Sequence, residues 1–188
     1  MGLRETAENL VFKPLADLTR DQLLQVLSIR NQDPVRMNMY NTHVIGEGEH
    51  LAWVERTIND PGTVFYAVMQ RDQIVGAVSL SSWSSVNRRA DWAFYLDTTI
   101  QGKGIGAALE YRFLTHVFHD LDVEKLNCEV LDFNDKVVAL HKKFGFSEEG
   151  VRREHVLRGK DAHDVVLLGM TRDEWDMKKR DLDKTLFK

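Results

Sequence analysis

Along much of the chain, hydrophobic residues alternate with polar ones over short runs, a pattern that indicates half-buried β-strands. Turn residues separate these runs, and Arg71-Asp72 predicts a tight hairpin between two of them. The pattern predicts strands at residues 11–15, 64–69, 74–82, 89–96, 126–131, 151–157 and 165–170. The three consecutive strands between residues 64 and 96 favour an antiparallel meander.

A second pattern, with apolar residues three or four positions apart, indicates amphipathic helices. It predicts helices at about 20–31, 47–58, 105–117 and 135–144. Thr19 or Asp21 can cap the first of them, and Gly145 ends the last. The intervening segment 32–46 shows neither period, so we expect it to be irregular.

The order of these elements predicts a mixed α/β (α+β) domain in which the meander leads into a β-α-β-α unit. A chain of 188 residues can bury one full-sized core. The chain shows no repeat and no linker, so we expect a single domain over residues 1–188, with its core from about residue 9 to about residue 176. The charged tail, 177–188, is interpreted as a solvated helix end or as a subunit contact in a homodimer.

The composition of the chain excludes several classes of function and partner. The formal net charge of -4 argues against a nucleic-acid partner, which needs a basic surface. The sequence has no apolar stretch long enough for a signal peptide or a membrane span. The single cysteine, Cys128, suits a reducing compartment, so we expect a cytoplasmic protein. His116 and His119 have no further ligands beside them, so no metal is expected.

Residues 101–106, Gln-Gly-Lys-Gly-Ile-Gly, lie between a predicted strand and a predicted helix. Alternating glycines turn backbone N–H groups toward one point, and the helix dipole adds to the attraction for phosphate. A Walker loop is absent, and a dinucleotide fingerprint would have to open a βαβ unit rather than follow a meander. The pattern [Q/R]-x-x-G-x-[G/A] fits Gln101, Gly104 and Gly106.

A second block contains Asn134 after the strand 126–131, then a helix with Leu140-His141, and then Gly145-Phe146. With both blocks in this order, the chain resembles the GNAT acetyltransferase superfamily over nearly its whole length. The resemblance implies a mixed, largely antiparallel sheet that is flanked by helices and splayed between strands 4 and 5. It also implies acetyl-CoA as cosubstrate and an amine as acceptor.

On this resemblance, the pantetheine arm lies between the splayed strands and an N–H near Leu96 polarises the thioester carbonyl. Residues 101–106 would hold the pyrophosphate. Asn134 would bind the pantetheine arm, although it could also cap the following helix. The cofactor-binding residues implied are Tyr95, Leu96, Asp97, Gln101, Gly102, Lys103, Gly104, Ile105, Gly106, Asn134 and His141.

His141 stands where the family often has a tyrosine that protonates the departing thiolate. An imidazolium can serve as that acid, or His141 can simply pack against the cofactor. Direct transfer also needs a group that accepts the amine's proton. The base candidates are Glu49, His50, His43 and Asp91, each of which also has a structural interpretation.

The N-terminal third resembles the branch of the superfamily that acts on UDP-linked amino sugars in pseudaminic acid biosynthesis. The implied acceptor is the 4-amine of UDP-4-amino-4,6-dideoxy-N-acetyl-β-L-altrosamine, with arginines meeting the phosphates. The substrate-binding residues implied are Arg30, Asn31, Arg36, Tyr40, His50 and Trp83. Acetylation of protein N-termini or polyamines is the alternative, and a non-catalytic acyl-CoA-binding module is an alternative of another class.

Overall fold

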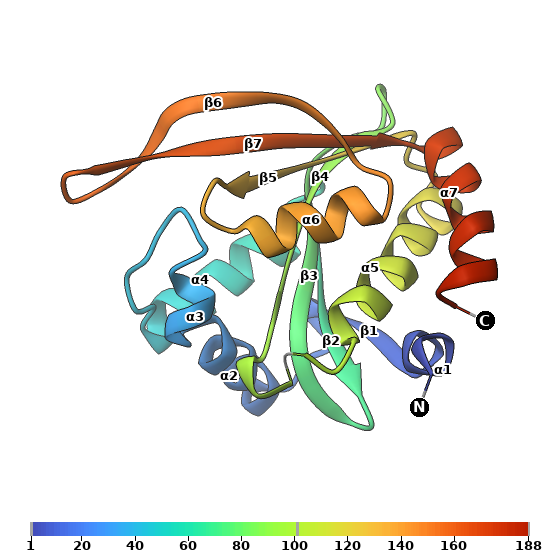
Figure 1. The fold of residues 1–188 in the computed structure, drawn as a ribbon. Coiled ribbons are helices and arrows are strands. Elements are labelled where there is room, and N and C mark those ends of the chain that lie inside the picture. Colours follow the sequence, from blue (N-terminus) through green and yellow to red (C-terminus); the bar gives the residue numbers. More distant parts are fainter. Residues whose placement is uncertain (1, 101, 188) are drawn as a thin grey trace.

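A computed structural model describes residues 2–100 and 102–187. Its centre is one seven-stranded sheet with the order β1-β2-β3-β4-β5-β7-β6 (Figure 1). The strands are β1 (Leu10–Pro14), β2 (Val64–Gln70), β3 (Gln73–Ser84), β4 (Arg89–Leu96), β5 (Lys125–Leu131), β6 (Ser147–Arg158) and β7 (Asp161–Thr171). All neighbours pair antiparallel except β4 and β5, which pair parallel.

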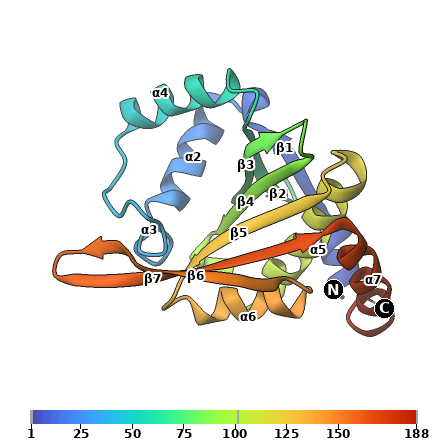
Figure 2. The ribbon, with the colours of Figure 1, turned by 90° about the horizontal axis from the view of Figure 1, so that it is seen from above.

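Helices cover both faces of this sheet. They are α1 (Leu3–Glu8), α2 (Arg20–Arg30), α3 (Asp33–Arg36), α4 (Glu47–Ile58), α5 (Ile105–Thr115), α6 (Asp135–Lys143) and α7 (Arg172–Thr185). The ribbon shows α2 and α4 on one face and α5 and α6 on the other (Figure 2). A capping box of Thr19 and Gln22 starts α2, so Thr19 rather than Asp21 is the cap.

The sheet opens between its two parallel strands, as predicted. β4 and β5 pair at only three positions, the last of which joins Asp91 to Asn127. Beyond that point β4 stays paired with β3 as far as Leu96, and β5 stays paired with β7 as far as Leu131. The two strands therefore diverge, and within the described residues the edges that face each other have no strand partner beyond this point. We call the point of divergence, at Asp91 and Asn127, the fork.

The largest hydrophobic cluster lies between the sheet and the helices α1, α5, α6 and α7, with Phe113 and Leu109 fully buried. A smaller cluster, which includes Val26 and Val54, packs α2 and α4 against the opposite face. The two clusters fix both layers of helices on the sheet that positions the site.

The core extends beyond the predicted limits of residues 9 and 176. At the N-terminus α1 buries Ala7, and at the C-terminus Trp175, Leu182 and Phe187 join the main cluster. Charged residues outnumber apolar ones along α7, so the sequence indicated a solvated helix end or a subunit contact and not a helix that contributes to the core. None of the described helices has both the length and the apolar character that a membrane span requires.

The last two strands form a hairpin longer than predicted. β6 and β7 project past the rest of the sheet, and both ribbon views place their far end beside α3 (Figures 1 and 2). Register shifts between Glu148 and Gly150 and between Arg152 and Val156 mark irregularities in this pairing. The hairpin thereby reaches the segment between α3 and α4, 37–46, which has little regular structure, as expected.

Candidate active site

The free edge of β4 forms one side of the opening. Asp97 donates its N–H to the carbonyl of Val75 at 2.9 Å, which fixes the end of the strand against β3. Gly76 permits this close approach, because a Cβ there would lie 2.2 Å from the carbonyl oxygen of Tyr95. β4 is thus drawn toward β3 and away from β5, and Tyr95, Leu96 and Asp97 lie where a bound chain could add to the sheet edge.

The glycine loop follows β4 and ends in the N-terminus of α5. Gly102 and Gly104 have φ values of +80° and +77°, in the left-handed region that favours glycine. Gly104 is also the N-cap of α5 and offers no side-chain cap, so the first-turn N–H groups at Ile105 and Gly106 have no cap partner. Lys103 donates to the Thr99 carbonyl at 3.4 Å. Gln101 lies outside the described residues.

This loop fits the diphosphate of acetyl-CoA on structural grounds. No described atom lies within 4 Å of the place where a Cβ on Gly102 would stand, so the approach to the loop is open. The unpaired N–H groups and the helix dipole both favour an anion there. The residues present therefore suit the cosubstrate that the sequence predicts.

Asn134 stands at the start of α6 but does not cap it. Its φ and ψ are -93° and 51°, and its side chain makes no capping hydrogen bond. Among the described residues its amide has no protein partner, and it lines a cavity beside the site. The structure thus leaves the Asn134 amide available to a ligand.

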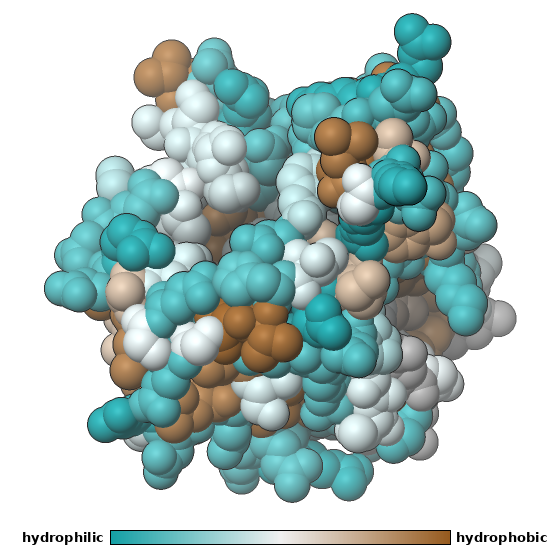
Figure 3. Space-filling view, turned by 90° about the vertical axis from the view of Figure 1, so that its left-hand side faces the viewer, coloured by the Kyte–Doolittle hydropathy of each residue, from teal (hydrophilic) through white to brown (hydrophobic). Residues whose placement is uncertain are grey.

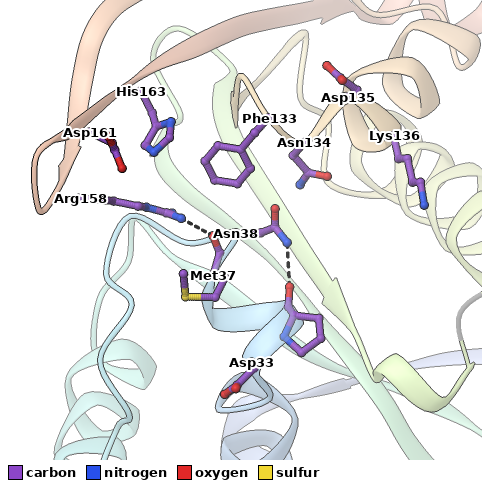
Figure 4. Close-up of a pocket in the computed structure, with 11 residues that line it drawn as sticks. Asp33, Met37, Asn38, Phe133, Asn134, Asp135, Lys136, Arg158, Asp161 and His163 are labelled. Atoms are coloured by element: carbon purple, nitrogen blue, oxygen red, sulfur yellow. Dashed lines mark hydrogen bonds between the residues drawn. The ribbon is translucent and has the colours of Figure 1, made fainter.

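This cavity has a volume of about 860 Å³ and lies between α3, the turn after β5 and the end of the β6–β7 hairpin (Figure 4). Figure 3 looks onto this side of the molecule and shows a hollowed face with apolar patches among hydrophilic side chains. Gln32, just before α3, accepts from the Thr98 N–H at 2.9 Å and donates to Asp97 at 3.2 Å, which ties this wall to the end of β4. The lining residues are Asp33, Pro34, Met37, Asn38, Phe133, Asn134, Asp135, Lys136, Arg158, Asp161 and His163.

Arg158 joins the hairpin to the segment after α3. Its guanidinium donates to the carbonyl of Met37 at 2.6 Å (Figure 4) and to that of Met39 at 2.9 Å. It also lies over the ring of Phe133, 4.8 Å from the ring centroid. From the sequence, Arg158 was interpreted only as a turn residue. Its contact with Met37 could not be predicted, because the two residues are 121 positions apart.

Three of the predicted substrate-binding residues hold the segment 37–46 by its backbone. Arg30 donates to the Asn41 carbonyl at 3.1 Å, and Arg36 donates to the Thr42 carbonyl at 2.7 Å. Asn31 exchanges two hydrogen bonds of 2.9 Å with the backbone of Ile45. None of the three lines the cavity. Each of the three spends at least one donor on the backbone of this segment, which orients the side chain toward the loop rather than toward the cavity.

Tyr40 and Trp83 were also predicted to contact the acceptor. Tyr40 is half exposed, and its hydroxyl donates to the carboxylate of Glu129 on β5. Trp83 lies on β3, and its neighbour Ser84 pairs with Arg89 at the start of β4. The sheet opens at the other end of β4. Trp83 packs against the main core, and its backbone N–H donates to the Gly62 carbonyl. The structure therefore places Trp83 away from the cavity.

The base candidates are separated by the fold. His50 is 4% exposed, donates from Nε2 to the Leu23 carbonyl at 2.9 Å and stacks on Trp53. Burial lowers the pKa of His50, so the ring is a neutral core residue rather than a contact for the acceptor. Glu49 is exposed and its carboxylate lies 2.8 Å from Nε2 of His43, and this bond lowers the pKa of Glu49.

Asp91 is the base candidate that the structure places at the fork. It forms the last β4–β5 pair with Asn127, and the Asn127 amide donates to its carboxylate at 3.1 Å. Because Ala90 and Trp92 turn into the main core, the alternation of the strand directs Asp91 to the opposite face. Asp91 thus lies at the fork on the side away from α5 and α6.

His141 lies on the other side of the fork. Its ring packs 5.1 Å from Trp92 and 6.0 Å from Phe94, both on β4, and Cys128 on β5 is a hydrogen-bonding neighbour. Nδ1 lies 2.9 Å from Oε1 of Glu110, and the two side chains are 3% and 0% exposed. Burial alone would lower the pKa of His141, but Glu110 and Cys128 outweigh it and raise the pKa to about 10.

Glu110 was missed in the sequence. It lies on α5 between Leu109 and Tyr111, four positions before Leu114, so a carboxylate stands within an otherwise apolar inward stripe. A buried charge needs a partner. A carboxylate among inward-facing apolar residues could therefore have marked Glu110 as a candidate functional residue. Sequence alone does not supply the partner, which lies 31 positions away.

Comparison with known proteins agrees with this arrangement. Residues 9–147 match the family model described as an acetyltransferase (GNAT) domain. The chain is 27% identical over 146 residues to the SPbeta prophage-derived uncharacterized N-acetyltransferase YokL of Bacillus subtilis (strain 168). This alignment covers 77% of the present chain and 82% of YokL. The chain is 23% identical over 135 residues to acetyltransferase PseH of Campylobacter jejuni, covering 72% of this chain and 83% of PseH.

Among solved structures, the chain resembles the spermidine N-acetyltransferase from Vibrio cholerae in complex with CoA and spermine. The TM-score is 0.81 with 22% sequence identity, over 89% of this chain and 98% of the other. At that identity the likeness shows the fold. The fold described above is therefore shared with a structure that holds CoA and spermine.

Proposed function

Since the chain belongs to the GNAT acetyltransferase family and is an acetyl-CoA-dependent N-acetyltransferase, we propose that it acetylates a small, positively charged amine bound in the cavity beside the fork. The observation that carries this proposal is the set of charges around the cavity. Three aspartates, Asp33, Asp135 and Asp161, line it, against the cations Lys136 and Arg158. Arg158 is committed to two backbone carbonyls and to Phe133.

A second ammonium group on the acceptor would find carboxylates at this cavity. Asp33 already pairs with Arg36 at 2.9 Å, whereas Asp135 and Asp161 have no ion pair in the described part of the chain. A diamine or polyamine therefore fits the cavity better than an uncharged amine. The Vibrio cholerae structure, which is a complex with CoA and spermine, supports the same class of acceptor.

A UDP-linked amino sugar is the second candidate, favoured by the similarity to PseH. Its diphosphate would need cationic donors, and the arginines expected to supply them, Arg30 and Arg36, donate to backbone carbonyls instead. Among the described residues that line the cavity, Lys136 is the cation left for that role, because Arg158 is committed elsewhere. The charges thus favour the cationic amine over the 4-amino sugar.

Acetyl-CoA supplies an acetyl group activated as a thioester. On the proposed mechanism, the N–H groups of the free β4 edge near Leu96 orient and polarise the carbonyl. Asp91, at the fork, accepts the proton of the attacking amine directly or through water. His141, on the opposite side of the fork, donates a proton to the departing sulfur. The two titratable groups thus stand on opposite faces of the sheet at the fork, so that one can serve the amine and the other the sulfur.

The test is a thiol-release assay with acetyl-CoA and a panel of amines: spermidine, a diamine, UDP-4-amino sugars and N-terminal peptides. We expect the highest kcat/KM with spermidine or the diamine. Asp161→Asn should lower that value by about tenfold, because one charge-assisted contact is lost, and should leave the KM for acetyl-CoA unchanged. The control is Asp72→Asn, in the β2–β3 turn away from the cavity.

Turnover with the UDP-4-amino sugar alone would overturn the cationic acceptor and favour the second candidate. Turnover with peptides alone would point to protein N-termini. Binding of CoA with no turnover of any amine would identify the chain as an acyl-CoA-binding module.

A further inference from the structure

Glu110 is an ionisable residue that lies buried beside the main hydrophobic cluster. It is 0% exposed, with Phe113 and Leu114 of the same helix also fully buried. Oε1 lies 2.9 Å from Nδ1 of His141, and Oε2 has no hydrogen-bond partner among the described residues. A buried ion pair stabilises a fold no better than well-packed apolar residues of the same size. Stability alone therefore does not explain the pair.

The position of His141 suggests what the pair does. Its ring lies beside Trp92 and Phe94 of β4 and beside Cys128 of β5, which are the strands that separate just beyond Asp91 and Asn127. Because Nδ1 is held by Glu110, Nε2 is the ring nitrogen left on the side away from the carboxylate. The ring can therefore face α5 with one nitrogen and the fork with the other.

We propose that Glu110 is a positioning residue that fixes the orientation of His141 and keeps its imidazole protonated, so that Nε2–H is the proton donor at the fork. The inference rests on the proposed function. As the C–S bond of the thioester breaks, the sulfur takes the proton from Nε2, and the imidazole becomes neutral. The proton that the amine releases goes to Asp91, and exchange with solvent restores both groups.

The charges around the ring support this arrangement. Glu110 on α5 and Cys128 on β5 are the titratable groups that face His141, while Trp92 and Phe94 on β4 and Phe146 after α6 contribute uncharged rings. Burial would lower the pKa of His141, and the opposing carboxylate raises it to about 10. An ordinary histidine, with a pKa of 6.5, would be mostly neutral at pH 7.5.

Glu110→Gln tests the proposal, because it keeps the shape and a carbonyl oxygen for Nδ1–H but removes the charge. The first readout is NMR titration of the His141 imidazole in the free protein. We expect the wild-type ring to stay protonated to above pH 9 and the variant ring to titrate at least two pH units lower. The second readout is kinetic: kcat at neutral pH should fall about tenfold to 100-fold, with both KM values within twofold.

Asp120→Asn is the matched control, because it removes a carboxylate 2.8 Å from Nδ1 of another histidine, His116, away from the fork. It should change neither kcat nor the titration of His141. If Glu110→Gln does not fold, the double variant Glu110→Leu/His141→Phe provides an apolar replacement. That variant should fold, bind acetyl-CoA and show the same loss of kcat.

A wild-type His141 that titrates near 6.5 would overturn the proposal, as would a folded Glu110→Gln variant with an unchanged titration and kcat. A folded double variant with wild-type kcat would also overturn it. The titration needs no acceptor, so it reports on Glu110 even if no amine in the panel is acetylated. That last result would count against the proposed function and not against the pairing.

Discussion

Two walls of the site are held in place in different ways. The cofactor wall, made of the free edge of β4 and the loop 102–106, is shaped by backbone: glycines at positive φ and the uncapped start of α5. The acceptor wall, the segment 37–46, has little regular structure. Side chains from α2, α3 and the β6–β7 hairpin hold it by its carbonyls.

The difference explains why one wall is easier to recognise than the other. A backbone-built site depends on glycines and on helix position, so it leaves a local pattern that related chains share. A segment held by distant side chains can change its own sequence while its anchors keep it in place. We therefore expect the cofactor wall to set the reaction and the acceptor wall to set which amine is used.

The largest effect should come from the cofactor wall. Gly104→Val places a β-branched residue at a φ of +77° and a Cβ 2.8 Å from Leu3 of α1. The loop must shift, which misaligns the N–H groups at the start of α5. We expect the Kd for CoA, measured by titration calorimetry, to rise about 100-fold.

Gly159→Val is the matched control. Gly159 has a φ of +63° and open space around it, at the turn of the β6–β7 hairpin. The backbone strain is similar, so both variants should lose thermal stability, but only Gly104→Val, whose Cβ also meets Leu3, should lose affinity for CoA. Equal loss of affinity in both would mean that general destabilisation, and not the loop, controls binding.

The acceptor wall should respond differently. Arg158→Ala removes two hydrogen bonds to the carbonyls of Met37 and Met39 and the contact with Phe133. Charge-assisted bonds of this kind contribute about 1.5–3 kcal/mol each, part of which is regained from water at an exposed site. We expect the KM for the amine to rise about tenfold to 30-fold, while the Kd for CoA stays within twofold.

Lys160→Ala, on the exposed turn of the same hairpin, is the control and should leave both constants unchanged. Arg158→Lys keeps the charge but not the planar fork that reaches two carbonyls, so its KM should be intermediate. A larger effect of Arg158→Ala on CoA than on the amine would contradict the division into two walls.

The same division describes what the sequence could reveal. The strands and the glycine loop follow from local periodicity and composition, and the resemblance to the acetyltransferase family added the opening between strands 4 and 5; the structure confirms this fold. Contacts such as Glu110 with His141 and Arg158 with Met37 join residues 31 and 121 positions apart. Only the folded chain brings them together. Arginines that looked like phosphate ligands proved to be anchors of a loop, because a guanidinium suits carbonyl oxygens as well as phosphates.

The smallest effect, and the finest test of the cofactor wall, concerns Asn134. Its side chain does not cap α6, so Asn134→Ala should leave the thermal stability nearly unchanged and raise the Kd for CoA about fivefold, through one lost hydrogen bond. Thr19→Ala is the opposite case, because Thr19 does cap α2; it should cost about 1 kcal/mol of stability and no affinity. If Asn134→Ala instead lost stability as Thr19→Ala does and kept its affinity, Asn134 would be a helix cap, and the cofactor wall would end at the glycine loop.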